Sequence, residues 1–147
     1  MPQTQFDVVI AGGAAVGSAV AYFLTADSGF RGSVAVIEPD PTYQRCATAL
    51  SAASIRHQFS TEENIRMSRF GTAFLRAFAD TLAVDGVRPD PAFHEGGYLF
   101  LATGDGQAVL QANHAVQRQC GVDVALLDRQ ALALRFPWLQ TQDLVGG

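Results

Sequence analysis

The sequence predicts an α/β fold built on a doubly wound parallel sheet. Residues 6–11 are an almost unbroken run of strand-forming residues, and a glycine-rich turn over 12–17 follows directly. A helical pattern comes next, and a second apolar strand over 33–37 ends on an acid, Glu38. This strand–turn–helix–strand order fits the roughly 30 residues of one right-handed parallel crossover, the repeating unit of such a sheet.

Composition and charge fit one ordinary globular chain and exclude several classes of partner. The chain has 147 residues, 48% of them hydrophobic and 16% charged, and its net charge is −4. All ten basic residues are Arg and form no cluster, so we expect no nucleic-acid partner. No apolar run reaches the roughly 18 residues of a membrane span. Cys46 and Cys120 lack any metal-ligand spacing, so we expect no metal site and a reducing, cytoplasmic location.

Periodicity defines the first strand and the first helix. The apolar run over 6–11 is typical of a parallel strand that is covered on both faces. Gly29 is expected to end the helix that follows. The spacing i, i+3, i+4, i+7, i+8 predicts one face of that helix, formed by Val16, Ala19, Val20, Phe23 and Leu24.

The middle of the chain predicts a second long helix. Ser60 and Glu63 have the spacing of a capping box, so Ser60 is expected to cap the helix start. The helix is expected to fade over 82–85. Its core face is marked by Met67, Phe70, Phe74 and Phe78.

Two strands and two helices are predicted in the last third. Strands are expected over 97–102 and 122–127, with a helix over 107–120 between them that Gly121 closes. A short helix is expected to follow, capped at its start by Asp128 and ended by Pro137.

A change of composition near Pro89 and Pro91 marks the predicted domain boundary. It divides the chain into a dinucleotide-binding region over 1–90 and the start of a second domain over 91–147. Neither region closes on itself, so both are expected to be incomplete.

The turn after the first strand matches most of the dinucleotide pattern G-x-G-x-x-G. Its key positions are Gly12, Ala14 and Gly17, so an alanine replaces the middle glycine. Gly12 would make the tight turn, and Gly17 would let helix and strand pack closely. The Ala14 methyl leaves room for a phosphate provided that its φ stays negative. A pyrophosphate would then meet the free N–H groups and positive dipole of the helix start.

Glu38 supplies the second half of the dinucleotide pattern. It follows Gly17 by about 20 residues, at the end of the second strand, where a carboxylate can accept hydrogen bonds from ribose hydroxyls. Its charge would repel a 2′-phosphate, which disfavours NADP. The same glycines also fit a plain strand-to-helix turn without a ligand. At this point the pattern does not separate FAD from NAD.

Segments beyond Glu38 resemble one family of flavoproteins. Residues 48–60, 95–101 and 135–139 are similar to the D-amino-acid oxidase-like FAD-dependent oxidoreductases, most of all to the sarcosine oxidase and dimethylglycine dehydrogenase branch. The resemblance covers essentially the whole chain, as the N-terminal portion of a longer protein. It implies a Rossmann-like FAD-binding sheet joined to the start of an antiparallel substrate-domain sheet.

The resemblance also assigns the site residues. Arg56 would lie near the flavin ring or a substrate carboxylate and is the one catalytic candidate, with a surface ion pair as the alternative. His57 is expected to be structural, and no histidine precedes the small residues of this segment to attach flavin covalently. The implied cofactor-binding residues are Gly12, Gly13, Ala14, Ala15, Val16, Gly17 and Glu38 for the adenine dinucleotide, and Thr48, Ser51, Ala52 and Ala53 for the flavin.

The implied activity is an FAD-dependent oxidation of a C–N bond in an amino-acid-like amine, with hydride transfer to the flavin. The partners would be a small-molecule amine and an electron acceptor, either oxygen or a carrier protein. This chain alone is expected to be incomplete and inactive. Two alternatives stay open: a non-catalytic flavoprotein of the same family that assists assembly of a respiratory complex, and a plain NAD-binding module.

Several aromatic and histidine residues admit a simpler interpretation. Residues 101–105 look like a second FAD-contacting strand, but their position after Tyr98 favours an early strand of the substrate domain. Phe93, Tyr98 and Phe100 are then core or substrate-floor residues. His94 and His114 have no spacing that predicts metal or base chemistry.

Overall fold

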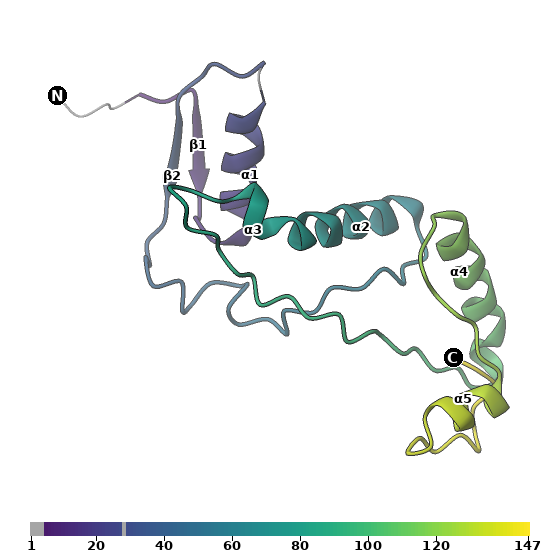
Figure 1. Cartoon of the computed structure of the whole chain (residues 1–147). Coiled ribbons are helices and arrows are strands. Elements are labelled where there is room, and N and C mark those ends of the chain that lie inside the picture. Colours follow the sequence, from purple (N-terminus) through teal and green to yellow (C-terminus); the bar gives the residue numbers. More distant parts are fainter. Residues whose placement is uncertain (1–4, 28) are drawn as a thin grey trace. The chain divides into compact units, whose positions relative to one another are not determined.

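The computed structural model describes residues 5–27 and 29–147, which form two compact units (Figure 1). Unit 1 is Met1–Ser54 and unit 2 is Ile55–Gly147. This division falls well before the change of composition near Pro89. The assignment of 1–90 and 91–147 to two functional domains therefore stays a prediction.

Unit 1 is a single strand–helix–strand crossover. Strands β1 (Val8–Ala11) and β2 (Val34–Ile37) pair in parallel, with Val8 opposite Val34 and Ala11 opposite Ile37. Helix α1 (Ala15–Ala26) connects them and lies against the pair in Figure 1. The predicted order of elements is confirmed.

Hydrogen bonds hold the two strands in register at both ends. At the start, the Asp7 carboxylate accepts from the Ser33 amide at 2.7 Å and from the Ser33 hydroxyl at 2.8 Å. These bonds, chiefly the one from the Ser33 backbone, lower the pKa of Asp7. At the other end, the Gly12 amide donates to the Ile37 carbonyl at 2.8 Å, which extends the ladder into the glycine turn.

The helix face of unit 1 differs from the predicted one. Val16 and Val20 are exposed, by 78% and 48%, whereas Gly17 and Ala21 are less exposed. Gly17 carries no side chain, so this part of the helix approaches the turn closely and faces the strands. Gly29 does not end the helix either, because α1 stops at Ala26.

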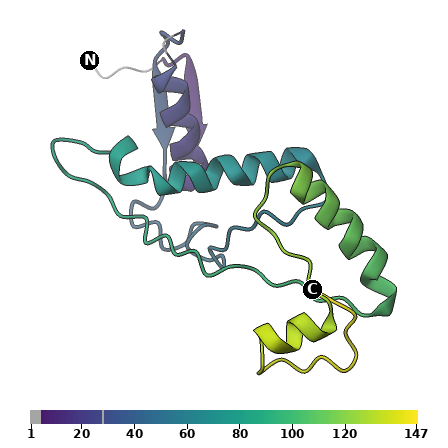
Figure 2. The same cartoon turned by 45° about the vertical axis from the view of Figure 1, so that its right-hand side comes forward.

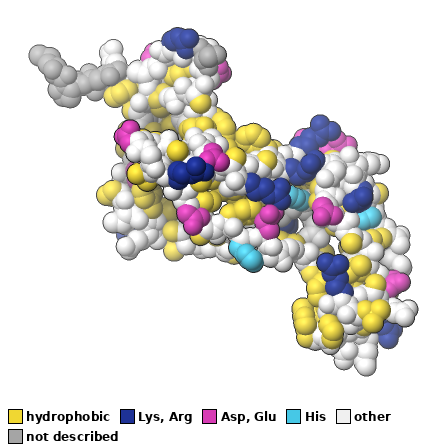
Figure 3. Space-filling view, in the orientation of Figure 1, with side chains coloured by type: hydrophobic (Ala, Val, Ile, Leu, Met, Phe, Trp, Pro, Cys, Tyr) yellow, Lys and Arg dark blue, Asp and Glu magenta, His cyan; other side chains and the backbone are white. Residues whose placement is uncertain are grey.

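Neither strand of unit 1 is covered on both faces, contrary to the prediction. Val9 is 55% exposed and Ile37 is 60% exposed, because α1 covers one face of the pair. Among the described residues, the sheet consists of β1 and β2 alone. Of the predicted doubly wound parallel sheet, only this one crossover is formed there. Figure 3 shows hydrophobic side chains at the surface of both units.

Unit 2 is built on helices. Helix α2 (Glu62–Arg76) is followed by the single turn α3 (Phe78–Thr81), and later by a 3-10 turn, η1 (Gly104–Gly106). Helices α4 (Gln107–Gln119) and α5 (Arg129–Arg135) complete the unit.

The first turn of α2 lies beside the end of α4 (Figure 2), and a small apolar core is buried between them. Ile65 is fully buried there against Cys120 and Val122. Polar bonds tie the same elements together. The buried Gln117 side chain donates to the Phe59 carbonyl at 3.1 Å, and the Arg69 guanidinium donates to the Cys120 carbonyl at the negative end of α4.

Gly121 closes α4 as predicted. Its φ is +72°, the left-handed conformation that glycine adopts without strain. The Gly121 amide donates to the Arg118 carbonyl and the Val122 amide to the Gln117 carbonyl, both at 2.9 Å. This pair of bonds is a Schellman motif, which satisfies carbonyls that the helix end would leave free.

The start and the exposed face of α2 correct two predictions. The N-cap is Thr61, without a side-chain cap bond, so the capping box at Ser60 is not formed. Met67 and Phe70 are 64% and 60% exposed, so they do not form a core face in unit 2. The helical segment does end near residue 82, as expected.

The two strands expected in unit 2 are not formed. In their place Gly146 makes isolated antiparallel bridges to Ala102 and to Asp128. The Ala102 amide donates to the Gly146 carbonyl at 2.9 Å, and the Leu127 amide donates to the Gly147 carbonyl at 2.8 Å. The three segments therefore pair at single residues, and the predicted antiparallel sheet is absent from the described residues.

The last helix follows its prediction. Asp128 is the N-cap of α5, and its carboxylate accepts from the Ala131 amide at 2.8 Å. The helix ends at Arg135, two residues before Pro137.

A pair of glycine substitutions tests the helix end of unit 2. Gly121→Ala should lower the free energy of unfolding by about 1 kcal/mol or more, because alanine resists a left-handed φ, and its methyl would approach Arg69 to 3.2 Å. Gly71→Ala lies inside α2 with open space around a methyl, and should raise the free energy of unfolding by about 1 kcal/mol. Urea unfolding measures both. Equal effects of the same sign would contradict the assigned conformations.

Candidate functional site

The glycine turn of unit 1 brings the start of α1 against the end of β1. Gly12 has a φ of +98°, which favours glycine. A Cβ at Gly17 would lie 1.8 Å from the Gly12 carbonyl oxygen, so a side chain at Gly17 cannot fit. Both glycines of the predicted pattern are therefore required by the geometry of the turn.

The first turn of α1 presents unpaired backbone donors. Ala14 is its N-cap, with a φ of −69°, and its side chain provides no capping acceptor. Within the described ranges the amides of residues 14–17 donate to no acceptor. The Ser18 amide already bonds to the Ala14 carbonyl at 2.9 Å. Such a row of N–H groups at a helix start suits a phosphate.

Glu38 lies beside this row and holds the turn in place. One carboxylate oxygen accepts from the Gly13 amide at 2.7 Å, and the other accepts from the Asp40 amide at 2.9 Å. Gly13 is buried, and its amide already donates to Glu38 and is not available to a ligand. Each carboxylate oxygen retains a further lone pair that a sugar hydroxyl can reach.

The predicted flavin segment forms a tight local turn in unit 1. The Ser51 hydroxyl donates to the Thr48 carbonyl at 2.8 Å and accepts from the Ala53 amide at 3.1 Å. Ala53 has a left-handed φ of 50°, and Ala52 is exposed like the rest of the segment.

Arg56 belongs to unit 2, where its guanidinium lies over two aromatic rings. It is 4.8 Å from the Phe59 ring centre and 5.5 Å from that of Phe100. Its side chain forms no ion pair within the part of the chain that the structure describes. Arg56 therefore does not form the surface ion pair that was its alternative role.

His57 has the structural surroundings that were expected of it. Its Nε2 lies 2.8 Å from the hydroxyl of the buried Thr72 on α2. Burial lowers the pKa of His57, and the positive charges of Arg69 and Arg76 lower it further, against an opposite effect of Glu95. Arg76 also forms an exposed ion pair with Glu95.

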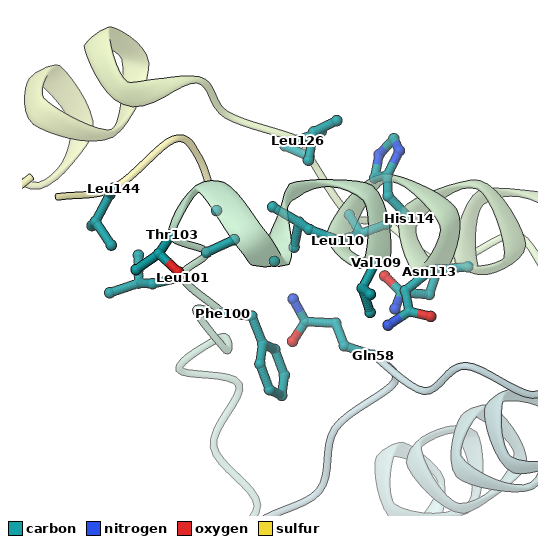
Figure 4. A pocket seen from close by; sticks show the side chains of 16 residues that line it. Gln58, Phe100, Leu101, Thr103, Val109, Leu110, Asn113, His114, Leu126 and Leu144 are labelled. Atoms are coloured by element: carbon teal, nitrogen blue, oxygen red, sulfur yellow. The ribbon is translucent and has the colours of Figure 1, made fainter.

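A pocket of about 470 Å³ lies wholly within unit 2 (Figure 4). Phe100, a predicted substrate-floor residue, lines it together with Leu110 of α4. Gln58 and His114 also line it, and the buried Oε1 of Gln58 has no hydrogen-bond partner in the described residues. No motif identified Gln58 or His114, because a lone amide or imidazole carries no spacing signal.

Comparison with known proteins identifies the family. The model of the family described as FAD dependent oxidoreductase matches residues 7–147. The chain belongs to this family. The family predicted from residues 48–60, 95–101 and 135–139 is thereby confirmed, and its cofactor is FAD.

Relatives with the same cofactor in their names match nearly the whole chain. "FAD-dependent oxidoreductase domain-containing protein 1" of Xenopus laevis is 44% identical over 144 residues, which is 96% of this chain and 29% of the relative. The Drosophila melanogaster homolog is 37% identical, over 99% of this chain and 28% of its own length. The chain thus spans less than a third of these relatives.

A solved structure supports the fold. The L-proline dehydrogenase from P. horikoshii matches with a TM-score of 0.68 and 25% identity, over 99% of this chain and 36% of that one. The α/β fold with a parallel strand pair is therefore shared with part of a longer dehydrogenase chain.

The residues of unit 1 fit the adenine dinucleotide of FAD. A Cβ would fill the close approach at Gly17, the donors of residues 14–17 are free for phosphate, and Glu38 lies beside them.

In the described part of the chain no helix has the length and apolarity to cross a membrane. Nor does any group of three His, Cys, Asp or Glu residues there come together as metal ligands.

The lowered pKa of His57 predicts a pH-dependent stability. The folded state favours neutral His57, so its contribution is complete above the unfolded pKa of about 6.5 and is lost as the pH falls toward the lower folded pKa. Between about pH 7.5 and about pH 5.5, the free energy of unfolding should fall more in the wild type than in His57→Gln. Urea unfolding at both pH values measures it. A parallel loss in the two proteins would exclude His57 as the cause.

Proposed function

We propose that unit 1 binds the adenine dinucleotide of FAD at the start of α1. The observation that carries the proposal is the coincidence of three features: the Gly17 approach to Gly12, the unpaired amides of residues 14–17, and the Glu38 carboxylate beside them. Any helix start leaves such amides without an intrahelical acceptor. What a plain strand-to-helix turn does not require is the acid held beside them.

The amides of residues 14–17 would donate to the pyrophosphate, assisted by the positive end of the α1 dipole. The free lone pairs of Glu38 would accept from the ribose hydroxyls. Gly12, Gly13 and Gly17 give the turn its shape. Thr48, Ser51, Ala52 and Ala53 are proposed, from the family resemblance, to border the flavin through backbone groups.

The family supports FAD over NAD as the dinucleotide. When bound, FAD supplies the two-electron acceptor for an oxidation. We propose that the substrate is an amino-acid-like amine oxidised at its C–N bond. The similar solved structure supports this class, because it is an L-proline dehydrogenase and proline is an amino acid with a secondary amine. Two free cysteines support a reducing, cytoplasmic location.

Arg56 is proposed to bind the substrate carboxylate. Its guanidinium is always charged, has no acidic partner of its own, and stacks on Phe59 and Phe100, which would orient its fork of donors. A carboxylate accepts two parallel bonds from such a fork.

Substitution of Gly17 tests the nucleotide site. Gly17→Ala should weaken FAD binding at least about ten-fold, because its methyl forces α1 away from the turn and displaces the donors. Ala14→Gly keeps the turn and should bind FAD at least as well as the wild type. Titration calorimetry gives both constants, and far-ultraviolet circular dichroism checks that each variant folds. A folded Gly17→Ala variant with unchanged affinity would place the phosphates elsewhere.

Substitution of Arg56 tests the substrate class. Arg56→Met should weaken binding of an N-methylated amino acid about ten-fold or more, which is the loss expected for a charge-assisted pair. Binding of the corresponding amine without a carboxylate should stay unchanged. Arg135→Met is the matched control, since Arg135 also lies over an aromatic ring, that of Phe136. Titration calorimetry measures each ligand. Equal losses for both ligands, or no loss, would remove Arg56 from the substrate site.

A further inference from the structure

Tyr43 reaches the glycine turn from the loop that follows β2. Its hydroxyl oxygen lies 3.4 Å from the point that a Cβ on Gly13 would occupy, and the Glu38 Cβ lies 3.1 Å from the same point. A phenol and a carboxylate side chain therefore border one position of the turn. No motif in the sequence identified Tyr43.

The loop holds Tyr43 in an unusual backbone conformation. Its φ is 58°, a region that residues with side chains rarely adopt. The Tyr43 amide donates to the Asp40 carbonyl at 3.0 Å, and the Cys46 amide donates to the Tyr43 carbonyl at 3.2 Å. The Asp40 carboxylate in turn accepts from the Thr42 amide at 3.0 Å and hydroxyl at 2.6 Å. Backbone and turn bonds thus aim the ring, which is itself 43% exposed.

The Tyr43 hydroxyl has no hydrogen-bond partner among residues 5–27 and 29–147. A phenol can both donate and accept, whereas an ionised carboxylate only accepts. A ribose carries hydroxyls and a ring oxygen, so it offers donors and acceptors together. The Glu38 carboxylate can only accept from the ribose hydroxyls, whereas a neighbouring phenol can donate to the ribose oxygens.

We propose that Tyr43 is a further residue of the nucleotide site and that its hydroxyl hydrogen-bonds to the adenosine half of the bound dinucleotide, beside Glu38. This rests on the proposed function of unit 1. It extends the site from the glycine turn to the loop after β2, and it makes Tyr43 a determinant of selectivity. Ligands with an adenosine half, FAD and ADP, would use the contact, and FMN, which lacks that half, would not.

The test compares Tyr43→Phe with the wild-type chain for FAD, ADP and FMN by titration calorimetry. Removal of the hydroxyl should weaken FAD and ADP by the same factor, about five-fold for one hydrogen bond, and leave FMN unchanged. Tyr22→Phe is the matched control, because it removes a tyrosine hydroxyl from α1 of the same unit, where the ring packs edge-on against Phe23. It should bind all three ligands as the wild type does.

A second measurement uses the wild-type chain and no variant. Tetranitromethane nitrates accessible tyrosines, and peptide mapping locates the product. ADP should protect Tyr43 and leave Tyr98 reactive, while FMN should protect neither.

The results distinguish a wrong role for Tyr43 from a wrong function for unit 1. If the wild type binds FAD and ADP but Tyr43→Phe binds both as well or better, or ADP fails to protect Tyr43, the inference is overturned and the proposed site stands. If the wild type binds neither FAD nor ADP, the proposed function itself is wrong and the inference falls with it.

Discussion

The hydrogen bond from the Gly13 amide to the Glu38 carboxylate ties the glycine turn to the end of the second strand. A charged acceptor makes such a bond roughly twice as strong as one between neutral groups. The bond occupies the Gly13 amide, next to the Gly12 amide that donates to Ile37 of β2, and the two bonds together fix how the turn enters α1. The amides of residues 14–17 then project from a turn whose shape the protein sets by itself. A ligand would meet donors that are already aligned, without an ordering cost at binding.

Unit 2 is stabilised by different means. Few of its side chains are fully buried, with Ile65 and Leu132 the largest of them in the described residues. Two polar bonds reinforce the small core at the end of α4: Gln117 donates to the Phe59 carbonyl just before α2, and Arg69 of α2 donates to the Cys120 carbonyl. Met67 and Phe70 remain exposed on α2, and the chain spans less than a third of its curated relatives.

Features set within a few residues could be predicted from the sequence. Gly121 and Asp128 act on amides and carbonyls at most four positions away, and both are where the pattern put them. The acid after β2 bonds to a turn 25 residues earlier, and the typical length of one strand–helix–strand crossover made this longer link predictable too. The family segments added FAD, which the spacing of glycines alone did not specify.

Features that depend on distant partners could not be predicted. The strands expected over 97–102 and 122–127 have the right residue types, but a strand forms only with a partner. Here Gly146 bridges Ala102 of the first and Asp128, just past the second. The outward position of Val16 follows from the close contact at Gly17, which apolar periodicity does not encode. The N-cap of α2 falls one residue later than the Ser60–Glu63 spacing indicated, at Thr61, whose side chain makes no cap bond. Tyr43 and Gln58 carry no repeating signal, and only the folded chain shows what they approach.

We propose that the amino end of α1 receives the phosphates of an adenine dinucleotide. Amide ¹H–¹⁵N correlation spectra of the labelled chain, recorded as ADP is added, test it most directly. The account predicts that the amides of Ala14, Ala15, Val16 and Gly17 shift together and saturate with one affinity, while those of Gly121 and Val122 stay in place. Saturable shifts confined to other residues, with these four amides unmoved, would contradict it.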